Sequence, residues 1–156
     1  MLKIESSIVI NRPVEEVFAV VSNLENNPRW SSAFLEVQKT SEGPIGVGTT
    51  WRATQKALGQ RLESEVEVTE YEPNRKFAQV SKSGPIPAKI WGNYEPVEGG
   101  TRVSIVLEAE VGGFFKLAEP LVKSMLKRSI EADFANLKDL MEAGALRAGE
   151  DTWLGK

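Results

Sequence analysis

Residues 60–71 carry the pattern that most restricts the fold, because apolar or small side chains alternate there with glutamates. The first set is Leu62, Ser64, Val66 and Val68, and the second set is Glu63, Glu65 and Glu67. Successive side chains of a β-strand point to opposite faces of its sheet. The segment therefore predicts a strand with one face in water and the other face covered by another part of the chain.

The same period of two continues from residue 34 to residue 111. The predicted strands are 34–41, 47–57, 60–71, 75–82, 88–96 and 101–111. Turn formers separate them, as at Glu72-Pro73-Asn74 and Gly99-Gly100. Residues 2–10 also alternate and predict a first strand, so the chain has seven. Short strands joined by tight turns are typical of an antiparallel meander.

Helical spacing predicts the cover for this sheet. From about residue 115 to 142, apolar residues keep to one broad helical face. They are Leu117, Leu121, Val122, Met125, Leu126, Ile130, Phe134, Leu137 and Met141. Two short helices are predicted after the first strand, one starting at Pro13 and one between Asn23 and Pro28. Together these elements predict an α+β fold.

The chain has 156 residues, which suits one domain. We expect that domain to cover residues 1–143, because Gly144 ends the long helical pattern. Residues 144–156 have weak periodicity and are predicted to form a flexible tail that contains Trp153.

Cysteine and histidine are both absent, and this absence excludes several kinds of chemistry. Thiolate catalysis, disulfides, Ser-His-Asp triads and histidine-bound zinc all require one of these residues. Glu63, Glu65 and Glu67 lie about 7 Å apart along one strand face and do not converge as ligands of a hard cation would. We therefore expect no metal site and no cofactor.

Charge and hydropathy restrict the partners and the location. The net charge is −3 and the basic residues form no concentrated patch, so we expect no nucleic-acid partner. The longest apolar run, Val17 to Val21, is far shorter than the roughly 20 residues that span a membrane. The N-terminus lacks the apolar block of a secretion signal. We expect a cytoplasmic protein with no transmembrane segment.

A seven-stranded sheet and one long helix can pack in two ways. The sheet can close on the helix to form an ordinary core, or it can leave a cavity that binds a small molecule. Inward positions on the strands include the neutral polar residues Ser64, Gln79 and Ser81. A ligand or ordered water would satisfy these groups, and so would a local bulge that turns them to solvent. The residues alone leave both packings open.

The aromatic residues allow the same two interpretations: they line the mouth of a cavity, or they belong to an ordinary core. Two glycines precede Phe114 and Phe115 and are compatible with a lid or with an ordinary loop. If a cavity exists, the candidate ligand-binding residues are Trp30, Phe34, Trp51, Ser64, Phe77, Gln79, Ser81, Tyr94, Phe114, Leu121 and Met125. No spacing identifies a catalytic pair. One hypothesis is that Tyr94, with Ser64 or Gln79, stabilises an enolate by hydrogen bonding.

Several segments in this order resemble the START-like (SRPBCC) superfamily, and most closely its polyketide cyclase/dehydrase and lipid-transport branch. The segments are INRPVEEVFAVVSNLENNPRW at 10–30, IGVGTTW at 45–51, VEVTEYEPNRKFA at 66–78, YEPVEGGTRVSI at 94–105 and FANLKDLME at the end of the last helix. The resemblance covers about residues 2–142. It implies a helix-grip fold, in which a seven-stranded antiparallel sheet wraps around the C-terminal helix with an apolar cavity between them.

The resemblance also favours a function. We expect the chain to bind a small, largely apolar ligand, lipid-, polyketide- or quinone-like, between the sheet and the last helix. Two alternatives stay open: a polyketide cyclase/aromatase or dehydrase enzyme, and a protein-interaction module of the co-chaperone type. A homodimer stays open as well. The matching segments are turns, caps and core positions, so they bring no catalytic residue to this chain.

Overall fold

The computed structural model describes residues 2–57, 59–84, 86–110 and 117–147. Its elements are β1 (Leu2–Ile10), α1 (Val14–Val21), the 3-10 turn η1 (Leu24–Asn26), α2 (Asn27–Trp30), β2 (Phe34–Lys39), β3 (Thr50–Ala57), β4 (Gln60–Glu72), β5 (Lys76–Ser83), β6 (Ala88–Val97), β7 (Gly100–Ala109) and α3 (Glu119–Glu142). The strands form one sheet in the order β1-β7-β6-β5-β4-β3-β2, and each neighbouring pair is antiparallel.

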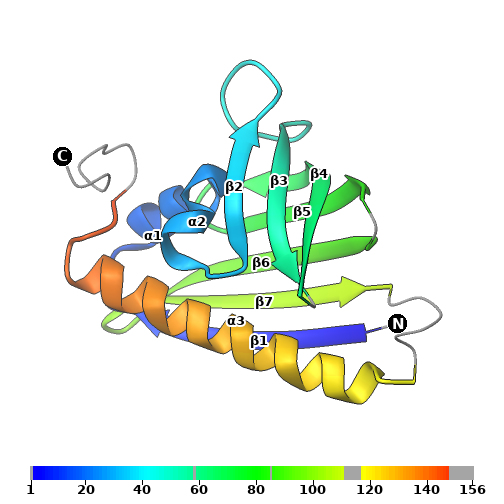
Figure 1. The fold of residues 1–156 in the computed structure, drawn as a ribbon. Coiled ribbons are helices and arrows are strands. Elements are labelled where there is room, and N and C mark those ends of the chain that lie inside the picture. The colour runs from blue at the N-terminus through cyan, green and yellow to red at the C-terminus, as the bar shows by residue number, and fades with distance from the viewer. Residues whose placement is uncertain (1, 58, 85, 111–116, 148–156) are drawn as a thin grey trace.

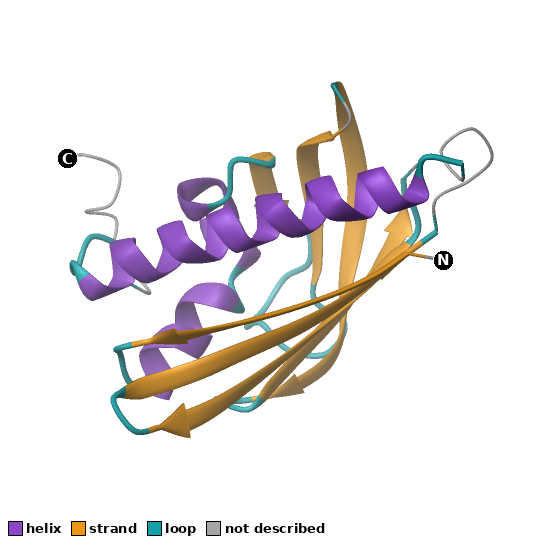
Figure 2. Ribbon diagram, turned by 90° about the horizontal axis from the view of Figure 1, so that it is seen from below, coloured by secondary structure: helices purple, strands orange, loops and turns teal. Residues whose placement is uncertain are grey.

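The sheet curves, and α3 lies along its open side (Figures 1 and 2). The short helices α1 and α2 lie near the C-terminal end of α3. This arrangement confirms the predicted α+β helix-grip fold. The predicted domain limits, residues 1–143, stay a prediction. Trp153, in the expected tail, lies outside the described residues.

Most of the predicted strand 47–57 forms as expected, but β3 begins only at Thr50. The preceding residues form a turn in which the Gly46 backbone N–H donates to Thr49 Oγ1 over 2.9 Å. Gly48 adopts φ +93°, a conformation that L side chains rarely adopt. A turn that depends on a left-handed glycine cannot continue the strand.

The core lies between the sheet and the helices. Phe18 of α1 packs edge-to-face against Tyr71 and Tyr94, with ring centroids 5.5 and 5.0 Å apart. Strict alternation along β4 would place Tyr71 on the same face as Glu67. The pairing of β4 with β5 shifts between Val68 and Glu70, so Tyr71 turns inward instead.

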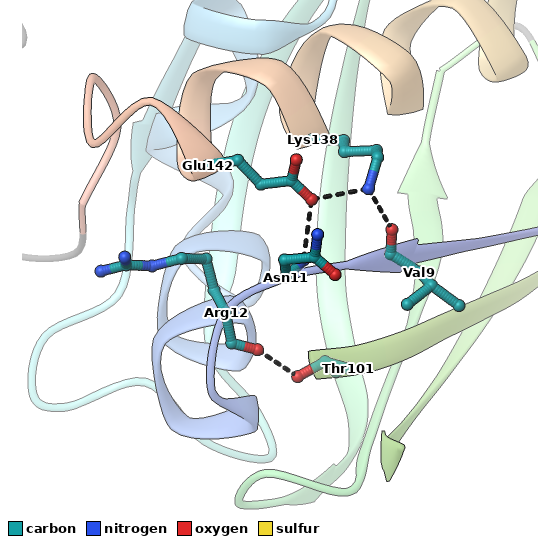
Figure 3. Close-up of polar contacts among 6 residues, drawn as sticks. All are labelled: Val9, Asn11, Arg12, Thr101, Lys138 and Glu142. Carbon is teal, nitrogen blue, oxygen red and sulfur yellow. Dashed lines mark hydrogen bonds and ion pairs between the residues drawn. The ribbon is translucent and has the colours of Figure 1, made fainter. Parts of the chain in front are cut away.

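A group of polar contacts joins the C-terminal end of α3 to the rest of the molecule. Lys138 donates to the carbonyl of Val9 over 2.8 Å and to Glu142 over 2.6 Å, while the Asn11 backbone N–H donates to Glu142 over 2.8 Å (Figure 3). Both hydrogen bonds to Glu142 lower its pKa, and the bond from Lys138 has the larger effect. The end of α3 is thereby tied to the end of β1.

None of the helices formed by the described residues combines the length and apolar character that crossing a bilayer requires.

Candidate ligand-binding site

A cavity of about 140 Å³ lies between the sheet and the helices. Strands β5, β6 and β7 supply one wall, through Phe77, Gln79, Ile90, Gly92, Tyr94, Ile105 and Leu107. The other wall comes from the helices and the start of β2, through Val21, Leu24, Asn27, Trp30, Ser31, Phe34, Ile130, Asp133 and Phe134. Most of these side chains are apolar, so the cavity offers an environment from which water is readily displaced.

Strand alternation explains the sheet wall. In β6, the side chains of Ile90 and Tyr94 share a face with Gly92, which has no side chain. A Cβ atom on Gly92 would lie 3.2 Å from the Tyr94 hydroxyl oxygen. The glycine therefore gives the Tyr94 ring and hydroxyl room beside the strand.

The helix wall is fixed by contacts between α2 and α3. Trp30 and Phe134 pack with ring centroids 6.1 Å apart, and the Asn136 amide donates to the carbonyl of Trp30 over 3.0 Å. Just after α2, the Ser31 hydroxyl donates to Asp133 over 2.5 Å. The backbone N–H of Ser32 donates to the other Asp133 oxygen over 3.2 Å. These contacts hold Trp30 against the cavity.

The cavity is almost uncharged. Tyr94 and Asp133 are the titratable side chains among its described lining residues, and no lysine or arginine is found among them. Burial raises the pKa of Tyr94, so the phenol stays protonated at neutral pH. The neutral groups Asn27, Ser31 and Gln79 supply the remaining polarity.

Three lining residues carry buried polar atoms without a hydrogen-bond partner among the described residues. They are Asn27 Oδ1, Trp30 Nε1 and Gln79 Oε1. Asn27 and Trp30 are 6% and 8% exposed, so bulk water does not compensate for the missing contacts. Two acceptors and one donor on lining residues are thus left unsatisfied, and all three atoms are themselves buried.

Five of the predicted ligand-binding residues line the cavity: Trp30, Phe34, Phe77, Gln79 and Tyr94. Phe114 lies outside the described residues.

The remaining predicted residues lie elsewhere. Trp51 is fully buried in the core, and its Nε1 has no partner in the described part of the chain. Ser64 packs closely against Gly84, where an added Cβ would lie 2.8 Å from the Ser64 Cβ. Ser81 accepts from the Ala88 backbone N–H over 2.9 Å, so its hydroxyl holds the loop between β5 and β6.

Leu121 and Met125 are 63% and 52% exposed and do not line the cavity. The apolar stripe of the predicted helix is wider than the surface that α3 buries. Val122, on the neighbouring part of the helix, is 6% exposed and packs with Leu2 and Ile4 instead. This packing turns Leu121 and Met125 outward.

Sequence reasoning missed Asn27, Ser31 and Asp133 as lining residues. Asn27 and Ser31 lie at the two ends of the four-residue helix α2, too short for periodicity to reveal an inner face. Asp133 is a charged residue on a helix whose sequence pattern assigns charges to solvent. Its partners, Ser31 and Ser32, are about a hundred positions away in the chain, a separation that local patterns do not report.

No group of three acidic side chains in the described ranges converges in a way that could hold a metal ion.

The sequence matches a known family over residues 1–142, the one described as polyketide cyclase/dehydrase and lipid transport. The chain belongs to this family. Among curated proteins, none matches the sequence.

Solved structures show that this member of the polyketide cyclase/dehydrase and lipid-transport family shares its fold with distant relatives. TTHA0849 from Thermus thermophilus is 20% identical, with a TM-score of 0.80 over 92% of this chain and 99% of that one. A START superfamily protein from Mycobacterium smegmatis is 17% identical, with a TM-score of 0.76 over 92% and 99%. The di-domain ARO/CYC protein StfQ from the steffimycin biosynthetic pathway is 10% identical, with a TM-score of 0.75 over 92% of this chain and 51% of StfQ.

Proposed function

We propose that this protein binds a small, largely apolar molecule in the cavity between the sheet and α3. The observation that carries the proposal is the cavity itself, about 140 Å³ in volume and lined mainly by aromatic and aliphatic side chains. Apolar cavities with a few fixed polar groups are the usual form of small-molecule sites. Membership of a family described by polyketide chemistry and lipid transport supports the same conclusion.

The size of the cavity indicates how much of a ligand it can hold. A cavity of about 150 Å³ in another protein takes up benzene, so 140 Å³ accommodates about one six-membered ring. Burying roughly 150 Å² of ring surface at about 25 cal/mol per Å² contributes about 4 kcal/mol. That free energy corresponds to a dissociation constant of about 1 mM for a single ring. A lipid- or quinone-like ligand would gain further affinity from the part that extends beyond this ring.

The enzymatic alternative, a polyketide cyclase/aromatase or dehydrase, draws support from the family description and from the likeness to StfQ. Such catalysis needs a general acid or base at the ligand. Among the described lining residues only Tyr94 and Asp133 have side chains that could act as an acid or base. Both Asp133 oxygens already accept hydrogen bonds from Ser31 or Ser32. The lining therefore favours binding over catalysis.

The interaction-module alternative would use the exposed face of the sheet. On that face Glu63 pairs with Arg52 at 3.7 Å, and Glu67 pairs with Lys82 at 3.4 Å. A charged, solvated surface of this kind differs from the apolar patches that mark protein interfaces. A cytoplasmic location, the lack of a nucleic-acid partner and the option of a homodimer stay predictions from the sequence.

Calorimetric titration with toluene tests the proposal, because toluene has the size and polarity that the cavity suits. We expect millimolar binding to the wild-type protein and none to an Ile105→Trp variant, whose larger side chain fills the cavity. Val47→Trp is the matched control, since Val47 is 70% exposed and lies outside the cavity. Circular dichroism establishes that each variant is folded. Equal toluene binding by the wild type and a folded Ile105→Trp variant would overturn the proposal.

A further inference from the structure

Three of the five large apolar side chains that the described residues expose lie in one short stretch at the start of α3. Leu121 and Met125 are 63% and 52% exposed, and Leu117, in the turn before the helix, is 97% exposed. In Figures 1 and 2 no described helix or strand covers the outer side of α3. Single exposed apolar residues are ordinary, whereas clustered ones mark a surface that contacts a partner. We call Leu117, Leu121 and Met125 the exposed row.

Unpaired cations accompany the exposed row. Lys123, Lys127 and Arg128 are exposed, and within the described part of the chain none of them forms an ion pair. Residues 120–130 contain these three cations and no carboxylate, in a chain whose net charge is −3. Arg128 follows Leu121 by seven residues and Met125 by three, so all three share one side of the helix. This surface is therefore positive as well as apolar.

A surface with both properties fits the interface of a lipid bilayer that contains anionic lipids. At such an interface an amphipathic helix lies in the membrane plane, with aliphatic side chains in the acyl region and lysine or arginine at the headgroups. The long stems of Lys and Arg lie along apolar surface while their charged ends stay among polar groups. We propose that the N-terminal half of α3 docks this protein on an anionic lipid surface. The inference goes beyond the proposed function, because it concerns a different surface and does not depend on the cavity.

A protein partner fits the same surface less well. A specific protein interface buries roughly 800 Å² on each partner around anchors that fill pockets. The exposed row is three aliphatic side chains on the outside of one helix, and none of them lines the cavity. It contains no aromatic residue, the type that most often anchors protein interfaces. A bilayer needs no complementary pocket, so charge and apolar character are sufficient for docking.

Co-sedimentation of the full chain with lipid vesicles tests the proposal. One vesicle is phosphatidylcholine alone, and the other is made of equal parts phosphatidylcholine and phosphatidylglycerol. We expect about a hundredfold stronger partitioning onto the anionic vesicle, because each of three cations near such a surface contributes about fivefold. Raising NaCl from about 0.1 M to about 1 M, which shortens the Debye length from about 10 Å to about 3 Å, should abolish most of this difference.

Neutralising two cations tests the positive part of the surface. Lys127→Gln/Arg128→Gln should weaken partitioning onto the anionic vesicle by about 25-fold. The matched control is Lys56→Gln/Arg61→Gln, which makes the same change in net charge at two exposed residues that pair across β3 and β4. We expect the control to stay within about threefold of the wild type, since these residues belong to another element.

Replacing apolar residues tests the exposed row itself. Leu121→Gln/Met125→Gln keeps good helix formers in α3 but removes the groups that would enter the acyl region. We expect at least about a tenfold loss of partitioning onto the anionic vesicle. The matched control is Leu35→Gln/Val47→Gln, at residues that are 44% and 70% exposed elsewhere on the surface. Circular dichroism and melting temperature establish that every variant is folded.

The outcomes separate this inference from its rivals and from the proposed function. Equal binding to the two vesicles, or binding to neither, would overturn the inference and leave the cavity unaffected. Equal losses in a variant of α3 and in its matched control would also overturn it, because the effect would then not belong to this surface. If no vesicle binds and the wild type self-associates in ultracentrifugation, reversal of that association by Leu121→Gln/Met125→Gln would assign the exposed row to a second copy of the chain instead.

Discussion

Two leucines on α3 differ sharply in environment, and their truncation tests how the helix is held. Leu137 is 0% exposed and belongs to the main core, whereas Leu121 is 63% exposed. Truncation of a fully buried leucine to alanine costs about 2–5 kcal/mol, because transfer free energy is lost and a cavity is left. For Leu137→Ala we expect about 3–4 kcal/mol, since the well-packed core around it limits collapse of the site. Leu121→Ala should stay within about 0.5 kcal/mol of the wild type.

Urea denaturation followed by circular dichroism measures both free energies of unfolding. For a domain of this size, each kcal/mol shifts the melting temperature by about 2–4 °C. Leu137→Ala should therefore melt about 6–16 °C below the wild type, and Leu121→Ala within about 2 °C of it. The two substitutions have the same chemistry on the same helix, so helix propensity cancels in the comparison. A loss for Leu121→Ala as large as that for Leu137→Ala would refute the described packing of α3.

Three further predictions concern the backbone, the end of α3 and the buried phenol. Gly100→Ala should prevent stable folding, because the added Cβ would lie 2.0 Å from the carbonyl oxygen of Ile10. In Gly99→Ala the added Cβ would lie 3.7 Å from Asn11 Oδ1, so at φ +85° this substitution should cost only about 1–2 kcal/mol. Equal losses of melting temperature in the two variants would contradict the close approach of Gly100 to Ile10. The folded-state pKa of Glu142 is lowered, so its stabilising effect is complete above the ordinary glutamate pKa and is lost as the pH falls through the lowered value. The difference in unfolding free energy between the wild type and Glu142→Gln should therefore shrink as the pH falls through and below the ordinary glutamate pKa, and a difference that grows would be evidence against the contact with Lys138. Burial raises the pKa of Tyr94, so its phenolate absorbance should appear only together with alkaline unfolding, and ionisation in the folded protein would contradict its burial.

The order of elements and the inner faces of the strands were predictable because they depend on local periodicity. Phe77, Gln79 and Tyr94 alternate with outward side chains in strands whose regular pairing the hydrophobic pattern reflects. The fate of Tyr71 was not predictable from alternation, since the bulge that turns it inward depends on pairing with β5.

The helix wall of the cavity was less predictable for a different reason. Its position depends on contacts between segments far apart in the chain, above all Ser31 with Asp133 and Asn136 with Trp30. Leu121 is as apolar as the buried residues of its helix. In this part of α3, however, Val122 packs against the sheet, and Leu121 stays exposed. Periodicity identifies an apolar face, whereas tertiary packing decides how much of that face is buried.

The most direct test of the cavity is a toluene titration of isotope-labelled protein followed by NMR. Trp30 lines the cavity and Trp51 does not, so their indole N–H signals report on the site and on the neighbouring core separately. We expect the signals of Trp30 and the backbone signal of Gln79 to shift together with one dissociation constant, while that of Trp51 moves little. Saturable shifts centred on Leu121 and Met125, or no shift at the solubility limit of toluene, would contradict binding in the cavity.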